Sequence, residues 1–178
     1  MRYFPIKKRD IYLMLLSVLI LSFGICTGLI FFSSLPNNPS ETDAINSLAI
    51  TPKYGINGAI QYFVTNIIAC SLLILGLVSF GIPTIFGLFL NGLILGVVID
   101  TKYMEGMNIL KIFTGIMTHG ILELPALIIA GYIGLKGFSF YFDKNKEWKK
   151  NLKLILLITG LLIGAGLIEA LITPLLIQ

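Results

Sequence analysis

The stretch from Tyr54 to Ile99 constrains the fold most, because it contains no Asp, Glu, Lys, Arg or His. A helix rises about 1.5 Å per residue, so about 20 apolar residues cross a hydrocarbon core about 30 Å thick. This stretch is roughly twice that length, and the chain must therefore cross twice within it. Phe80-Gly81-Ile82-Pro83 marks the reversal, either at the membrane surface or as a re-entrant turn below it.

Three further apolar segments complete a predicted bundle of five spans. The five cover about 11–32, 59–80, 82–99, 112–137 and 152–173. Because 56% of the residues are hydrophobic and only 12% are charged, we expect an all-α, polytopic membrane bundle forming a single transmembrane domain over residues 1–178. The first apolar run is too long for a signal peptide and has no small-x-small cleavage site, so we interpret it as an uncleaved anchor.

The segment between the first two spans is polar and rich in proline. Ser40-x-x-Asp43 resembles a capping box, and four apolar residues after it share one helix face: Ala44, Ile45, Leu48 and Ala49. We expect a short amphipathic helix there, resting on the outer membrane surface or on the other helices. Pro174 would end or kink the fifth span.

The distribution of the thirteen Lys and Arg residues indicates the orientation of the chain. Five spans put ten of them on one side, Arg2, Lys7, Lys8, Arg9, Lys136, Lys144, Lys146, Lys149, Lys150 and Lys153, and leave Lys53, Lys102 and Lys111 on the other. This bias predicts a multi-pass protein of the cell membrane with a cytoplasmic N-terminus and an extracytoplasmic C-terminus. A four-span chain would separate the two basic regions. Basic residues at membrane edges indicate topology rather than nucleic-acid binding.

Aromatic residues mark the same predicted water interface. Phe138, Phe140, Tyr141 and Phe142 precede the basic loop that contains Trp148, the only tryptophan. Aromatic belts of this kind lie at headgroup level. The basic loop could also bind anionic lipid or a cytoplasmic partner, although the positive-inside bias alone explains it.

The fourth span places an imidazole and a carboxylate inside an apolar helix. His119 and Glu123 are four residues apart and therefore share one helix face. Two residues later, Pro125 removes a backbone donor, which predicts a kink beside them. Ionisable groups in hydrocarbon cost about 2.5–3.5 kcal/mol each on insertion scales, so they indicate a functional site.

Three more polar residues lie at a similar depth in three other spans. Asn66, Asn91, His119 and Glu169 fall roughly 7–14 Å below the outer surface, and Glu123 lies near the midplane. We expect these five residues to share a polar cavity in the outer half of the bundle. The alternative is purely structural, because hydrogen bonds between membrane helices are common and contribute about 1 kcal/mol each.

Other chemistry is weakly supported by the sequence. His119, Glu123 and Glu169 could bind a metal, but one histidine is few for zinc and the second His of His-Glu-x-x-His is missing. Intramembrane hydrolysis with Glu123 as base lacks a nucleophilic serine motif. Cys26 and Cys70 lie in apolar runs and act as small hydrophobes. We predict no metal, no cofactor and no catalytic residue.

Three Gly-x-x-x-Gly pairs could let helices approach closely, at Gly24 and Gly28, Gly92 and Gly96, and Gly160 and Gly164. Roughly two such pairs are expected by chance at this glycine content, so the motif alone supports helix packing only weakly.

Several segments together resemble the stage II sporulation protein M family. They are His119-Gly120-Ile121-Leu122-Glu123-Leu124-Pro125, Leu90-Asn91-Gly92 with Gly96, Asn66, and Ile168-Glu169-Ala170-Leu171-Ile172-Thr173-Pro174. The resemblance covers most of the chain from about Tyr62 onward. It implies a five-span integral membrane protein that, in spore formers, works in a complex with two cell-wall-degrading partners during engulfment. It assigns no catalytic function, and it implies that Asn66, Asn91, His119, Glu123 and Glu169 are core-site positions.

Three functional hypotheses follow, in this order. The first is a non-enzymatic membrane scaffold that positions partner proteins. Its partners would be membrane lipid, membrane or cell-surface proteins, and a second copy of the chain. The second is a small transporter or permease component that binds a solute or proton at His119, Glu123 and Glu169. The third is an intramembrane hydrolase.

Overall fold

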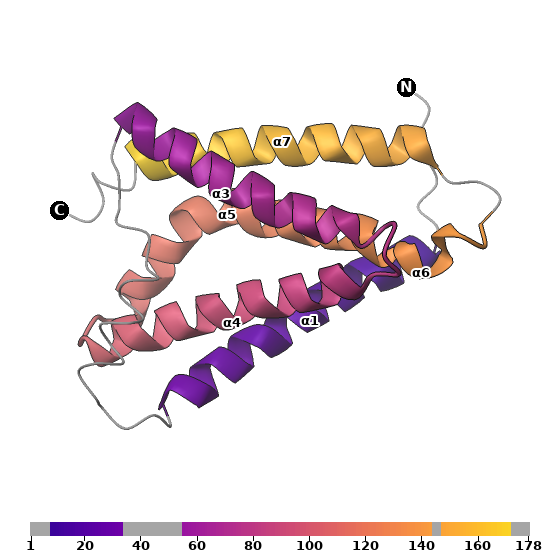
Figure 1. Cartoon of the computed structure of the whole chain (residues 1–178). Coiled ribbons are helices and arrows are strands. Elements are labelled where there is room, and N and C mark those ends of the chain that lie inside the picture. Colours follow the sequence, from indigo (N-terminus) through magenta and orange to yellow (C-terminus); the bar gives the residue numbers. More distant parts are fainter. Residues whose placement is uncertain (1–7, 34–54, 144–146, 172–178) are drawn as a thin grey trace.

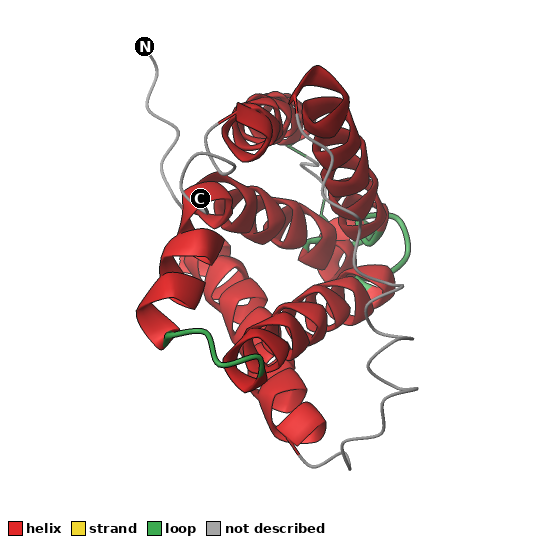
Figure 2. Ribbon diagram, turned by 90° about the vertical axis from the view of Figure 1, so that its left-hand side faces the viewer, coloured by secondary structure: helices red, strands yellow, loops and turns green. Residues whose placement is uncertain are grey.

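The computed structural model describes residues 8–33, 55–143 and 147–171, and within these ranges it contains helices and no strand (Figure 2). The helices are α1 Lys8–Ser33, α3 Gly55–Leu75, α4 Ile82–Met104, α5 Ile109–Leu135, α6 Gly137–Phe140 and α7 Trp148–Leu171. Five of them are long and apolar enough to cross a membrane, which confirms the predicted all-α membrane bundle. The short helix expected near residues 40–49, and Pro174, lie outside the described residues.

The second and third spans are separated by a tight turn. Helix α3 ends at Leu75, earlier than the predicted limit near residue 80. The amide of Gly81 donates to the carbonyl of Gly76 at 2.7 Å, and Gly81 has a φ of 75° that favours glycine. Pro83 follows in the first turn of α4, where its missing N–H leaves no hydrogen bond unmade.

This turn lies at one end of the bundle, beside α6 and the start of α1 (Figure 1). We call this the α6 end, and the opposite end the far end. The Tyr141 hydroxyl, just after α6, donates to the carbonyl of Val78 in the turn, and the Phe138 ring packs against Gly81. The reversal is therefore held at the end of the bundle by the segment that joins α5 to α7.

Helices α1 and α4 pack backbone against backbone along a glycine seam. A Cβ atom at Gly92 would lie 2.2 Å from the carbonyl oxygen of Leu21, and one at Gly28 would lie 2.3 Å from that of Leu93. Two of the three Gly-x-x-x-Gly pairs thus face each other, whereas an added Cβ at Gly160 would meet nothing within 4 Å. The seam gives the pair α1 and α4 the close approach that membrane helices need to associate.

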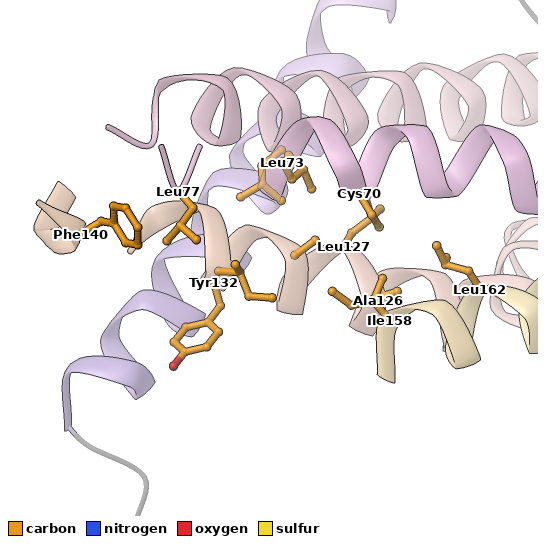
Figure 3. Packing of buried hydrophobic residues seen from close by; sticks show 12 residues of the cluster. Cys70, Leu73, Leu77, Ala126, Leu127, Tyr132, Phe140, Ile158 and Leu162 are labelled. Carbon is orange, nitrogen blue, oxygen red and sulfur yellow. The ribbon is translucent and has the colours of Figure 1, made fainter. Parts of the chain in front are cut away.

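Helices α3, α5 and α7 pack against one another and form a second body around the second half of α5. The buried apolar side chains gather there (Figure 3), among them Cys70, Leu73, Ala126, Ala130, Tyr132, Ile133, Ile158 and Leu162. The α1–α4 pair joins this body in the half nearer α6. There the Thr84 hydroxyl donates to the Leu73 carbonyl at 2.7 Å, and Gly131 lies against Leu88 and Ser17.

Towards the far end the two bodies diverge (Figure 1). Within the described residues, the backbone of α1 approaches α4 and α5 but neither α3 nor α7. Helix α5 is bent along its length (Figure 1), as its internal Pro125 predicts. The bend lets the first part of α5 connect to α4 while the second part forms the centre of the α3–α5–α7 body.

The glycine seam can be tested by adding single methyl groups. We expect Gly96→Ala to destabilise the protein by about 1–3 kcal/mol. The added Cβ would lie 2.3 Å from the carbonyl oxygen of Ile25, and this backbone atom cannot easily move away. Gly160→Ala is the matched control, and we expect it to be neutral or stabilising by up to about 1 kcal/mol. Reversible unfolding in detergent micelles measures both, and equal effects would contradict the seam.

Candidate functional site

Two of the five predicted site residues are joined across helices. The side-chain amide of Asn66, on α3, donates to the Glu123 carboxyl, on α5, at 2.6 Å. Both side chains are half-buried. We call them the amide–carboxyl pair. A carboxyl inside an apolar bundle is costly unless it is hydrogen-bonded, and the pair provides this within the protein.

Two further predicted residues lie on the helices of the same body. His119 is in α5 and Glu169 is in α7, but their side chains are outside the described part of the structure. An added Cβ at Gly164 would lie 3.0 Å from Leu122, so α7 runs past the turn of α5 that carries Glu123. The helices of four predicted residues are therefore neighbours, and a shared cavity stays a prediction.

Asn91 makes a different contact. Its amide donates to the carbonyl of Gly87, within its own helix, at 2.7 Å. Helix α4 packs mainly on α1, and its backbone does not approach α7 in the described residues. The structure therefore gives Asn91 a bond within α4 and no described bond to the amide–carboxyl pair.

A second polar region, which the sequence analysis did not identify, lies at the α6 end. We call it the charged cluster, and it consists of Arg9, Asp10, Tyr132, Lys136, Asp143, Glu147, Lys150 and Asn151. Lys150 Nζ lies 2.6 Å from the Asp10 carboxylate, and Arg9 lies 2.7 Å from Asp143. These contacts tie the first turn of α1 to α7 and to the segment before it.

Lys136 occupies the middle of the charged cluster. It donates to the Asn151 side-chain oxygen at 2.9 Å and lies 3.4 Å from the Glu147 carboxylate. Its ammonium group lies 4.4 Å from the centroid of the Tyr132 ring, and that of Lys150 lies 5.7 Å from it. The Tyr132 hydroxyl points away from the apolar side chains around it (Figure 3). One buried tyrosine thus separates the hydrophobic core from the charges and contributes cation–π attraction.

Three members of this cluster are buried to a degree that is unusual for charged and polar side chains, whereas Arg9 and Asp143 are partly exposed. The exposed fraction is only 2% for Asp10, 6% for Lys136 and 3% for Asn151. Beside them is a pocket with about 260 Å³ of empty space including its open mouth, lined in part by Arg9, Lys136 and Asn151. Charges buried this deeply are expected to be paired, as these are.

The sequence did contain a signal for this cluster. The five-span topology already puts Arg9, Asp10, Lys136, Glu147 and Lys150 at the same end of the bundle. Three acids, Asp10, Asp143 and Glu147, lie among the ten basic residues of this side, and acids placed among so many bases indicate ion pairing as well as orientation. Both regions therefore use polar groups to join helices, the amide–carboxyl pair between α3 and α5 and the charged cluster among α1, α5 and α7.

Comparison with known proteins identifies a family and a relative. The model of the family described as Stage II sporulation protein M matches residues 17–174. An uncharacterized protein of Methanocaldococcus jannaschii is 28% identical over 170 residues, which is 90% of this chain and 93% of that protein. No solved structure matches.

The amide–carboxyl pair can be measured by a double-mutant cycle with Asn66→Leu and Glu123→Leu. We expect a coupling free energy of about 1 kcal/mol, the range found for hydrogen bonds between membrane helices. Asn91→Leu is the control, because its bond stays within α4, and it should show no coupling to Glu123→Leu. Coupling near zero for Asn66 and Glu123 would mean that the bond does not hold α3 to α5.

The charged cluster predicts a large effect of removing one buried charge. Lys136→Met should cost about 3–5 kcal/mol of unfolding free energy, because it removes the buried donor of Asn151 and the nearer of the two cations beside Glu147. Lys102→Gln breaks an exposed ion pair with Glu105 and should cost less than about 1 kcal/mol. Unfolding of both variants under one detergent condition tests this, and a small cost for Lys136→Met would refute the role of the cluster.

Proposed function

This chain belongs to the stage II sporulation protein M family, and from that premise we propose that it is a scaffold of the cell membrane that positions partner proteins. Its polar groups are largely used between its own helices, at the amide–carboxyl pair and in the charged cluster. These contacts connect the helices both in the middle of the bundle and at the α6 end. A bundle whose helices are fixed in this way suits a protein that holds other proteins in position.

We further propose that the α6 end faces the cytoplasm. Six described basic residues lie at or near this end, whereas Lys102 and Lys111 flank the connection between α4 and α5 at the far end. The six are Lys8, Arg9, Lys136, Lys149, Lys150 and Lys153. The positive-inside bias supports this orientation, which leaves the C-terminus outside.

The observation that carries the scaffold proposal is a set of exposed aromatic side chains at the α6 end. We call it the aromatic cap, with exposed fractions of 49% for Phe80, 52% for Phe138, 51% for Tyr141, 81% for Phe142 and 58% for Trp148. Phe80 stacks on Tyr141 with ring centroids 4.8 Å apart. The buried Phe140 touches both Tyr141 and Trp148 edge-on.

The buried Phe140 thus holds the aromatic cap in position, while the outer faces of the cap residues are exposed. Aromatic residues are enriched in protein interfaces and dominate their energetics, because they bury a large area at low entropic cost. We propose that a membrane protein partner binds the cap at headgroup level on the cytoplasmic side. Phe142 is its most exposed member and the natural point to probe.

Photo-crosslinking tests this scaffold role. A photoreactive amino acid at position 142 should yield protein adducts in native membranes, whereas one at Leu19, exposed in the middle of α1, should react with lipid only. Phe142→Ala should reduce recovery of the adducted partner in mild detergent at least tenfold without changing unfolding, since the ring touches solvent or lipid. Equal adducts at both positions, or unchanged recovery, would contradict the proposal.

A second candidate function, binding of a solute or proton, is favoured by the Asn66–Glu123 bond. An intramembrane carboxyl beside a proline-bent helix is a common feature of transport pathways. This candidate predicts that Glu123→Gln and Glu169→Gln abolish function while the protein still inserts and folds. If both variants support full activity in cells, the transport candidate fails and the scaffold remains.

A further inference from the structure

The two bodies of the bundle are connected unevenly. Near the α6 end they meet through close packing of Ser17 and Leu88 on Gly131, and of Thr84 on Leu73. Towards the far end they diverge (Figure 1). Whatever fixes their angle must therefore act near the α6 end, where the charged cluster lies.

The link between α1 and α7 consists of charges rather than backbone packing. These two helices do not approach each other in backbone within the described ranges. Their side chains bridge the distance, with Lys150 at 2.6 Å from Asp10 and Arg9 at 2.7 Å from Asp143, which precedes α7. Asp10 is almost fully buried in this contact.

The charged cluster is not fully satisfied. Arg9 Nε and Asn151 Nδ2 are buried without a hydrogen-bond partner in the described part of the chain, and both residues line the pocket. A buried ionic network with missing bonds is usually less stabilising than apolar side chains of the same volume. Stability alone therefore does not explain why charges occupy this junction.

The backbone at the start of α7 is also strained. Glu147 has a φ of 46°, which is uncommon for a residue with a side chain. Its carboxylate lies 3.4 Å from Lys136 and 3.7 Å from Lys150, and its carbonyl accepts from the amide of Asn151. Lys150, which pairs with Asp10 of α1, thus also contacts this strained residue.

We propose that the Asp10–Lys150 and Arg9–Asp143 ion pairs form a latch that sets the angle between the α1–α4 body and the α3–α5–α7 body. When the latch opens, the glycine seam keeps α1 and α4 together as one unit. That unit swings about the turn at Gly76–Gly81, and the bodies separate further at the far end. The first part of α5 follows α4, and the bend near Pro125 takes up the change.

This motion reaches the amide–carboxyl pair. Glu123 lies two residues before Pro125, on the helix that must flex, while Asn66 lies on α3, which stays within its body. Opening of the latch at the α6 end therefore changes the geometry of a polar contact near the middle of the bundle. The latch gives the chain two arrangements that a partner at the α6 end could select.

Distances between spin labels test the latch in the full chain. In a background with Cys26→Ala and Cys70→Ala, one label pair spans the two bodies at Ile94 on α4 and Ile60 on α3. A second pair lies within one body, at Leu19 on α1 and Leu90 on α4. All four labelled side chains are exposed, so labels perturb packing little.

We expect Lys150→Gln and Asp10→Asn to lengthen and broaden the Ile94–Ile60 distance distribution and to leave the Leu19–Leu90 distribution unchanged. The charge-reversed double variant Asp10→Lys with Lys150→Asp should restore the original distribution. Lys102→Gln, which removes an exposed ion pair at the far end, should change neither. The latch is refuted if Lys150→Gln leaves the Ile94–Ile60 distribution unchanged, or if both label pairs broaden together, which indicates general loosening.

Discussion

Hydrocarbon gives apolar helices no hydrophobic reason to associate, so this bundle depends on places where backbones approach closely. The glycine seam between α1 and α4 is the clearest, with Gly92 and Gly96 set against the carbonyls of Leu21 and Ile25. A similar approach brings Gly134 of α5 against the Leu73 carbonyl of α3. These contacts divide the chain into two bodies, because each joins some helices tightly and leaves others apart.

Polar contacts between helices add to the close backbone packing. The amide–carboxyl pair joins α3 to α5 at mid-depth, and the charged cluster joins α1, α5 and α7 at the α6 end. Both are expensive to bury, and both are paired within the protein. The large exposed apolar side chains of all five long helices face outward, as lipid requires. We propose that a protein partner binds this outer surface at the aromatic cap.

The sequence predicted the parts of this structure that hydropathy and helix period control. The five spans, the reversal at Gly81 and the bend of α5 follow from apolar lengths, Gly and Pro. Similar predicted depths placed Asn66 and Glu123 among the five residues expected to share a cavity. The structure contains a bond between these two, and the shared cavity stays a prediction. Depth does not say which helices are neighbours. The bond of Asn91 within α4 therefore could not be predicted. The facing glycine pairs and the charged cluster could not be predicted either, since both depend on which helices are neighbours in the bundle.

The most direct test concerns the orientation of the α6 end. In a background without Cys26 and Cys70, Phe142→Cys and Met107→Cys would be treated with a membrane-impermeant thiol reagent in sealed vesicles of both orientations. We expect Phe142→Cys to react only from the cytoplasmic face and Met107→Cys only from the outer face. Reaction of both from one face would contradict this orientation.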